Sequence, residues 1–157
     1  MMTVTVPKEL KDDEVVINRW LADDLQAKIG DALTMRYFVV RTAGKLEEQT
    51  NRFRIHSVIP LEGAAADRDL MPDFPGLAKA ESSHDWDTGF PIDLGKIRPQ
   101  DERYWKDFRG TPKAFVTLAA GQRMWANRFG DLTAIRLANV STNMFERSIQ
   151  VDMSIQD

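Results

Sequence analysis

The sequence predicts an α+β fold, in which two strand-helix-strand units surround one mixed sheet and a long insertion of loops and helix separates them. One pattern occurs twice, over residues 15–34 and again over 114–133: a short apolar run, a helical stretch with a tryptophan, a Gly-Asp pair and a new apolar run. Between them, residues 61–112 differ in composition and are rich in loop-forming residues. We therefore expect residues 1–157 to form a single domain, with 61–112 as an insertion within it.

The first unit begins with the apolar run 15–17, which is followed by Asn18. Asparagine favours the N-cap of a helix, so a strand should end and a helix begin at this residue. The helical spacing places Leu21 and Leu25 on one apolar face. Gly30 is expected to end the helix, because glycine adopts the left-handed conformation easily.

Two alternating segments predict strands at about 33–41 and 51–59. Residues 43–45 contain the turn-forming glycine between them, so we expect a long hairpin. His56 falls on the polar face of the second strand, where it should be solvated or paired across the strands. The residues expected in the core of the whole domain are Leu21, Leu25, Tyr37, Val39, Ile55, Val116, Trp125, Phe129 and Ile135.

The insertion 61–112 contains eleven acidic and seven basic residues, a net charge of −4 in a chain whose net charge is −3. Six of the chain's seven prolines lie in it or directly before it, and it holds six of the 14 aromatic residues. A disordered linker would be poor in aromatic residues, so we expect an ordered insertion. The pattern predicts a helix over 99–108 that stops at Gly110, and a shorter helix over 77–81.

The second unit follows the insertion. Alternation resumes at 113–118, a helix should continue to Phe129 and end at Gly130, and a strand is expected over 132–137. The tail from Ser141 fits both a helix and a strand by its spacing, and a capping-box pattern favours the helix.

The composition excludes several classes of function. The chain has no cysteine, so it has no disulfide and no thiolate metal site. Its Lys and Arg residues are dispersed and the net charge is −3, so we expect no nucleic-acid partner. It lacks a glycine-rich phosphate loop and the usual hydrolase and zinc motifs, so we expect no cofactor, no metal and no catalytic residue. No stretch approaches the ~20 apolar residues of a membrane-spanning helix, which fits a cytoplasmic protein or a fragment cut from between membrane segments.

One cluster has the chemistry of a metal site, and it consists of His84, Asp85, Asp87 and nearby Asp93. Imidazole and carboxylate groups could hold a divalent cation. Ligands so close in sequence converge only when a loop curls around the ion, so we expect a structural turn whose Asp side chains cap backbone amides. The pair Asp101-Glu102 and the run 67–69 could suggest acid/base carboxylates, but such pairs are also common on acidic surfaces.

Three aromatic residues of the insertion are candidates for contact with a partner: Tyr104, Trp105 and Trp86. Tyr104 and Trp105 are neighbours on the expected helix, so one ring should face inward and the other should be partly exposed. An exposed ring would serve as a contact anchor. The alternative is that these rings only hold the insertion on the sheet, and that Trp86 anchors its loop.

Several motifs follow one another in a particular order, at residues 15–25, 30–31, 37–40, 53–60, 111–118 and 130–136, and within the insertion at 63–68 and 73–76. In this order they resemble the extracytoplasmic domain of FtsX/MacB-type ABC transporter permeases, over roughly residues 15–137. The departure from the family is that this chain carries no transmembrane helices. It would therefore be a domain excised from a longer permease.

The resemblance implies a non-catalytic domain on the extracytoplasmic, or periplasmic, side of the inner or plasma membrane. Such a domain couples conformational change to the handling of substrate or partner. The implied partners are a cytoplasmic ATPase subunit, reached through the membrane part of the permease, and a second permease copy or an envelope protein. Two alternatives remain open: a soluble metal- or carbohydrate-handling enzyme that uses the cluster at residues 84–93, and a free-standing binding module that uses the insertion 61–112.

Overall fold

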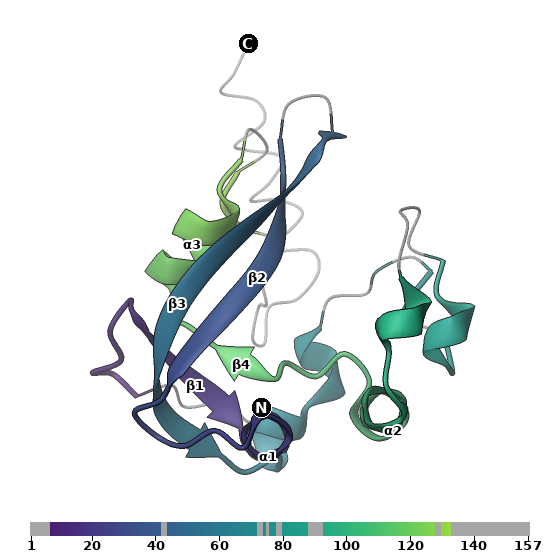
Figure 1. The fold of residues 1–157 in the computed structure, drawn as a ribbon, viewed down its shortest axis with the longest axis horizontal. Helices are drawn as coiled ribbons and strands as arrows, with labels where there is room; N and C mark the ends of the chain where they lie inside the picture. The colour runs from purple at the N-terminus through teal and green to yellow at the C-terminus, as the bar shows by residue number, and fades with distance from the viewer. Residues whose placement is uncertain are drawn as a thin grey trace, which may run out of the picture.

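The computed structural model describes residues 7–41, 44–71, 74, 76–77, 80–87, 93–127 and 130–132. Within these residues four strands form one mixed sheet in the order β2-β3-β1-β4, which confirms the expected α+β class (Figure 1). The strands are β1 (Glu14–Asn18), β2 (Ala32–Val40), β3 (Leu46–Ile59) and β4 (Ala114–Phe115). β1 runs parallel to β3 and antiparallel to β4, and β2 and β3 are antiparallel.

The core is built around β1, whose five residues are all buried. Val15, Val16 and Ile17 form a continuous apolar run, as is typical of a strand covered on both faces. The buried residues that pack together come from both halves of the described chain, and they are Val15, Ile17, Ala22, Phe53, Ile55, Ala120 and Met124. The two strand-helix units therefore share one core.

Helix α1 (Arg19–Leu25) begins where the sequence predicts, because the backbone N–H of Leu21 donates to Asn18 Oδ1 at 2.9 Å. It ends earlier than expected: Gln26 takes the left-handed conformation with φ 53°. Gly30 also has a positive φ, but its N–H already donates to Ile55 O at 2.8 Å, so it belongs to the turn into β2. Leu25 lies in the last turn and is 48% exposed, so its assignment to the core is wrong.

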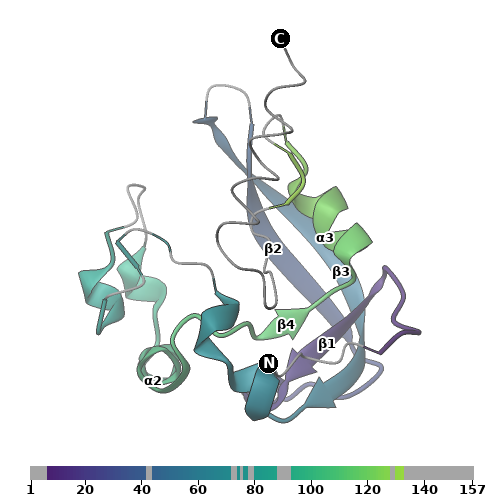
Figure 2. The same cartoon turned by 180° about the vertical axis from the view of Figure 1, so that it is seen from behind.

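The long hairpin is confirmed, with β2 and β3 paired from Ala32↔Arg54 to Val40↔Leu46. Burial alternates along β2 as the sequence predicts, so that Val39 is buried while Phe38 is exposed. Figure 2 shows the hairpin extending beyond the shorter strands of the sheet. β3 begins at Leu46, about five residues before the expected strand.

A register shift occurs where β1 pairs with β3: Val15 lies opposite Ile55, and Val16 lies opposite Ser57. His56 is the extra residue of this bulge, and its Nδ1 lies 3.2 Å from Glu14 Oε2. The expectation of cross-strand pairing for His56 is therefore confirmed.

Helix α3 (Leu118–Trp125) covers one side of the hairpin, where the ring of Trp125 packs 5.0 Å from that of Tyr37. Trp125 remains 37% exposed, so its assignment to the core is wrong, although its ring contacts the hairpin. β4 is only two residues long because Thr117 caps α3, accepting from Ala120 N–H at 3.1 Å. The helix ends four residues before the expected end at Phe129. Phe129, Ile135, the strand expected after Leu132 and the tail from 141 lie outside the described residues.

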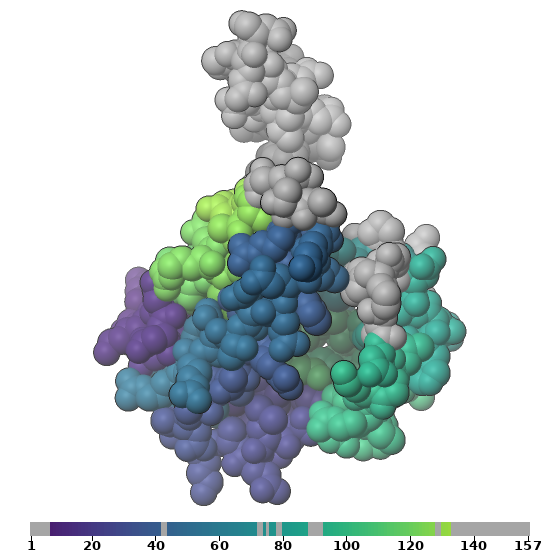
Figure 3. All heavy atoms as spheres, turned by 45° about the horizontal axis from the view of Figure 1, so that its top comes forward, coloured from purple at the N-terminus to yellow at the C-terminus, as the bar shows by residue number. Residues whose placement is uncertain are grey.

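The insertion lies on the flank of the sheet away from α3, with the hairpin between them (Figure 3). Its helix α2 (Pro99–Phe108) has the expected bounds. Arg109, not Gly110, takes the positive φ after the helix, and a Cβ at Gly110 would lie 1.8 Å from Met71 Sδ, so a larger residue there would require the Met71 side chain to move. Elsewhere in the insertion the described residues form short 3₁₀ turns, at Gly63–Ala66, Arg68–Leu70, Ser83–Asp85 and Leu94–Lys96.

The shorter helix expected over 77–81 is not formed at the residues of this range that the structure describes. Ala80 N–H donates to Leu77 O at 3.0 Å in a single turn, and Ala80 and Glu81 are not helical. Over the described ranges no helix is long and apolar enough to cross a membrane.

Candidate functional site

Helix α2 docks on the junction between β1 and α1 through a buried chain of hydrogen bonds. Asn18 Nδ2 donates to the Tyr104 hydroxyl at 3.1 Å, and that hydroxyl donates to Thr111 O at 2.9 Å. Asn18 is fully buried and Tyr104 is 4% exposed. Burial raises the pKa of Tyr104, which keeps its hydroxyl protonated and able to donate.

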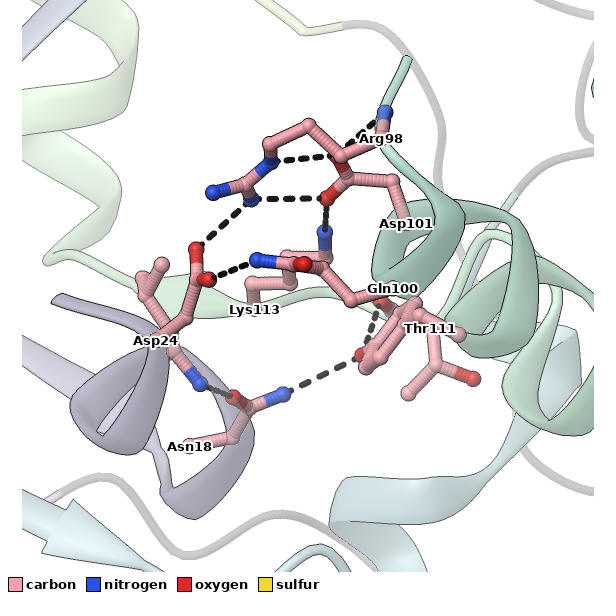
Figure 4. A network of polar contacts seen from close by, with 9 residues as sticks. Asn18, Asp24, Arg98, Gln100, Asp101, Thr111 and Lys113 are labelled. Carbon is pink, nitrogen blue, oxygen red and sulfur yellow. Dashed lines mark hydrogen bonds and ion pairs between the residues drawn. The ribbon is translucent and has the colours of Figure 1, made fainter.

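A second set of contacts, carried by charged groups, lies beside the first (Figure 4). The Arg98 guanidinium donates to Asp24 at 2.7 Å and to Asp101 at 2.8 Å and 3.0 Å, and Gln100 Nε2 donates to Asp24 Oδ1 at 2.7 Å. Arg98 precedes the helix and Asp101 lies in its first turn, where a carboxylate is also favoured by the helix dipole. We call the whole set the insertion joint: Asn18, Asp24, Arg98, Gln100, Asp101, Tyr104, Thr111 and Lys113.

The electrostatics of the joint favour the ionised carboxylates. Hydrogen bonds from Arg98 lower the pKa of Asp101 to about 2 and also lower the pKa of Asp24. Lys113 Nζ lies 3.6 Å from Asp101 Oδ1, and 3.8 Å and 4.5 Å from the ring centroids of Trp20 and Tyr104. Desolvation lowers the pKa of this half-buried lysine, and the charge of Asp101 opposes that shift.

We expect the joint to respond to acid. Asp101 has a pKa of about 2 in the folded chain against 3.8 when unperturbed, so its contribution to stability is complete above about pH 4 and is lost as the pH falls towards about 2. Asp101→Asn should lower the free energy of unfolding at pH 7 by about 1–2 kcal/mol, since Arg98 is half exposed and solvent screens the pair.

Denaturant unfolding at pH 7 and at about pH 2.5 tests this, because the difference between Asp101→Asn and the unaltered chain should shrink at the lower pH. Asp107→Asn, an exposed change on the same helix, is the matched control and should have little effect at either pH. An effect of Asp101→Asn that is equal at both pH values would contradict the joint as described.

The expectation that Tyr104 or Trp105 is partly exposed is wrong. Trp105 is 7% exposed, and its Nε1 donates to Ala80 O at 3.1 Å. Consecutive rings are both buried because α2 is covered on two sides: Tyr104 packs 4.8 Å from Trp20 of α1, while Trp105 packs 4.9 Å from Trp86 of the insertion's own loop. Trp86 is half-buried, so of the three candidates for partner contact only this ring keeps appreciable exposure.

A pocket of about 530 Å³ opens beside α2, and Trp86, Tyr104 and Trp105 contribute aromatic walls to it. Three cationic side chains line it as well, those of Lys96, Arg109 and Lys113, together with the carboxylate of Asp101. The joint and the pocket therefore share four residues: Asp101, Tyr104, Thr111 and Lys113.

His84 and Asp85 lie in the single 3₁₀ turn Ser83–Asp85, and Asp93 directly precedes another, Leu94–Lys96. His84 N–H donates to Ser82 Oγ at 3.2 Å, Asp87 N–H donates to Gly76 O at 3.1 Å, and His84 and Asp85 are exposed. The part of the chain that the structure describes, which includes all four residues of this cluster, contains no group of three His, Asp or Glu residues arranged to hold a metal ion.

The carboxylates of Asp101 and Glu102 do not form a pair. Asp101 is held by Arg98, whereas Glu102 accepts from the backbone N–H of Ser83 at 3.2 Å and from the Ser83 hydroxyl. In the run 67–69, Asp67 Oδ1 caps the Asp69 N–H at 2.9 Å. The carboxylates of Asp67, Asp101 and Glu102 therefore each accept hydrogen bonds that support the local structure or the packing of the insertion.

The sequence shows only part of the joint. Asn18 is recognisable as a helix cap, and Arg98 with Asp101 flanks Pro99 at a spacing typical of a helix start. Lys113 and Asp24 carry no comparable signal, because their partners lie far away along the chain. Comparisons with models of known protein families, with curated proteins and with solved structures found no match to this chain.

Proposed function

We propose that the chain is a non-catalytic extracytoplasmic domain of an FtsX/MacB-type ABC transporter permease. Two observations support this: the order of motifs along the chain, and the α+β fold whose second strand-helix unit returns to the same core after a long insertion. The observation that carries the proposal is the insertion joint, which fastens the insertion to the first strand-helix unit through buried polar contacts.

The joint suits a domain that transmits movement. Asn18 ends β1 and caps α1, while Tyr104 lies in the middle of α2, so their hydrogen bond ties a core strand to the insertion. Buried hydrogen bonds are directional, so they resist sliding of α2 against the first strand-helix unit. A displacement of that unit would therefore move α2 with it. In the proposed transporter, a separate cytoplasmic ATPase subunit hydrolyses ATP and the membrane part of the permease moves this domain.

The proposed partners are a second permease copy or an envelope protein. The insertion is the proposed contact surface because it forms its own flank of the molecule, apart from α3 (Figure 3). Loops and short turns held on a rigid scaffold are common sites of recognition.

The proposed location can be tested in the full-length parent protein. Apolar segments of about 20 residues should flank the domain in the gene. Lys28→Cys introduces an exposed thiol into a domain that has no cysteine, and a membrane-impermeant maleimide should label it in intact cells as strongly as in lysed cells.

Ala22→Cys is the matched control, because Ala22 is 3% exposed and should be labelled only after denaturation. Any cysteine elsewhere in the parent protein is replaced first. Labelling of Lys28→Cys only after lysis, or a parent protein without apolar flanking segments, would overturn the permease proposal.

A further inference from the structure

The pocket beside α2 has the composition of a small-molecule site. Its volume of about 530 Å³ lies within the range of ligand pockets, and its surface is predominantly apolar. Trp86 and Trp105 meet edge to face at 4.9 Å, and Tyr104 adds a third ring, so the walls are large, rigid and aromatic.

The charges that line the pocket are unbalanced. Lys96, Arg109 and Lys113 contribute three positive charges, while Asp101 contributes the one negative charge among the lining residues. Asp101 is held by Arg98 through two hydrogen bonds at 2.8 Å and 3.0 Å, but Arg98 is shared with Asp24. Lys96 is paired with Asp93, which does not line the pocket, at 3.4 Å. When these partners are counted, the pocket keeps a small positive excess within an insertion whose net charge is −4, and this excess favours a singly charged anion.

Two polar groups of the pocket residues have hydrogen-bonding capacity in reserve. Lys113 Nζ has its nearest carboxylate oxygen at 3.6 Å, which is longer than a good hydrogen bond, and its side chain is one-third exposed. The Nε1–H of Trp86 is buried and has no acceptor among the residues that the structure describes. A buried N–H without an acceptor is costly, and Trp86 is one of the residues that line the pocket.

We propose that this pocket binds a small organic carboxylate carried on an aromatic or other apolar body. The apolar body lies against the rings of Trp86 and Trp105, and the carboxylate pairs with Lys113. A singly charged carboxylate matches a site with one half-buried ammonium and mostly apolar walls. The pocket would take such a ligand whether or not the domain belongs to a permease.

The test uses the whole 157-residue chain and 4-phenylbutyrate as the probe, with 4-phenylbutan-1-ol as its neutral counterpart. Amide NMR spectra should show saturable shifts at Gly110 and Thr111 and at the Trp86 indole N–H. The carboxylate should bind at least about tenfold more tightly than the alcohol, since a hydrogen bond to a charged group is lost in the alcohol. Raising the salt concentration from about 50 mM to about 500 mM should reduce this difference.

Lys113→Met should abolish the preference for the carboxylate while keeping the apolar stem of the side chain. Lys106→Met is the matched control, because Lys106 is exposed on α2 and does not line the pocket. Trp86→Phe keeps an aromatic ring but removes the unsatisfied N–H, so it should weaken binding of the carboxylate more than binding of the alcohol.

Equal binding of the acid and the alcohol, shifts that map away from the pocket, or an unchanged preference in folded Lys113→Met would each overturn the proposal. If circular dichroism shows that Lys113→Met does not fold, Trp86→Phe and the shifts in the unaltered chain decide. An acidic peptide that binds this pocket more tightly than 4-phenylbutyrate would also overturn it, because the occupant would then be a protein segment.

Discussion

Ile17→Ala is expected to lower the free energy of unfolding by about 3–4 kcal/mol, because it removes three carbon atoms from the centre of the core and leaves a cavity. Ile17 has no exposed surface and lies on β1, the strand that pairs with both β3 and β4. Few atoms near an interior strand can move to fill the space. Urea unfolding followed by circular dichroism measures the change directly.

Leu25→Ala provides the matched control for this prediction. Leu25 is 48% exposed at the end of α1, so its truncation should cost less than about 1 kcal/mol. Similar losses for Ile17→Ala and Leu25→Ala would contradict the core described here.

Asn18→Ala should cost about 3 kcal/mol, although it removes only one small polar side chain. The side chain makes three contacts: Oδ1 accepts from the Leu21 N–H, and Nδ2 donates to the Tyr104 hydroxyl and to Pro112 O at 3.4 Å. Alanine removes the helix cap and leaves these buried groups without their partner. Thermal and denaturant unfolding should both report the loss.

Two further variants separate the helix cap from the insertion joint. Thr117→Ala removes the cap of α3 at a half-buried site, together with the hydrogen bond from the Thr117 hydroxyl to Asp12, and should cost about 1 kcal/mol, the usual value of a cap. A double-mutant cycle of Asn18→Ala with Tyr104→Phe should give a coupling of about 1 kcal/mol across the joint. A coupling near zero would mean that the hydrogen bond between Asn18 and Tyr104 does not hold the insertion in place.

Local patterns predicted most of the individual elements. The alternation along β2 and β3 predicted the hairpin because side chains of a strand point to opposite faces, whatever lies around it. Pro99 as an early-turn residue and Gly110 as the stop predicted the bounds of α2, and Asn18 predicted the start of α1. These features depend on residues that are close in sequence, so the sequence alone contains the information needed to predict them.

Both α1 and α3 were predicted to extend four residues beyond the residue at which each helix ends. In α1, Gln26 takes the left-handed conformation that was expected of Gly30, and Gly30 bonds to Ile55 of β3. The residue at which α1 ends depends on how the chain turns towards the sheet. The spacing of apolar residues along the helix does not reveal that turn.

The sequence by itself determined the fold class, the hairpin, α2 and the aromatic, acidic character of the insertion. Only the tertiary structure decided that Leu25 is exposed, that Tyr104 and Trp105 are both buried, and that Asn18 meets Tyr104 across 86 positions of the chain. The pocket beside α2 is also a product of packing, since Trp86, Trp105 and Lys113 come from separate segments. The physical reason is that burial and pairing depend on which elements cover one another, whereas periodicity and capping depend only on neighbours along the chain.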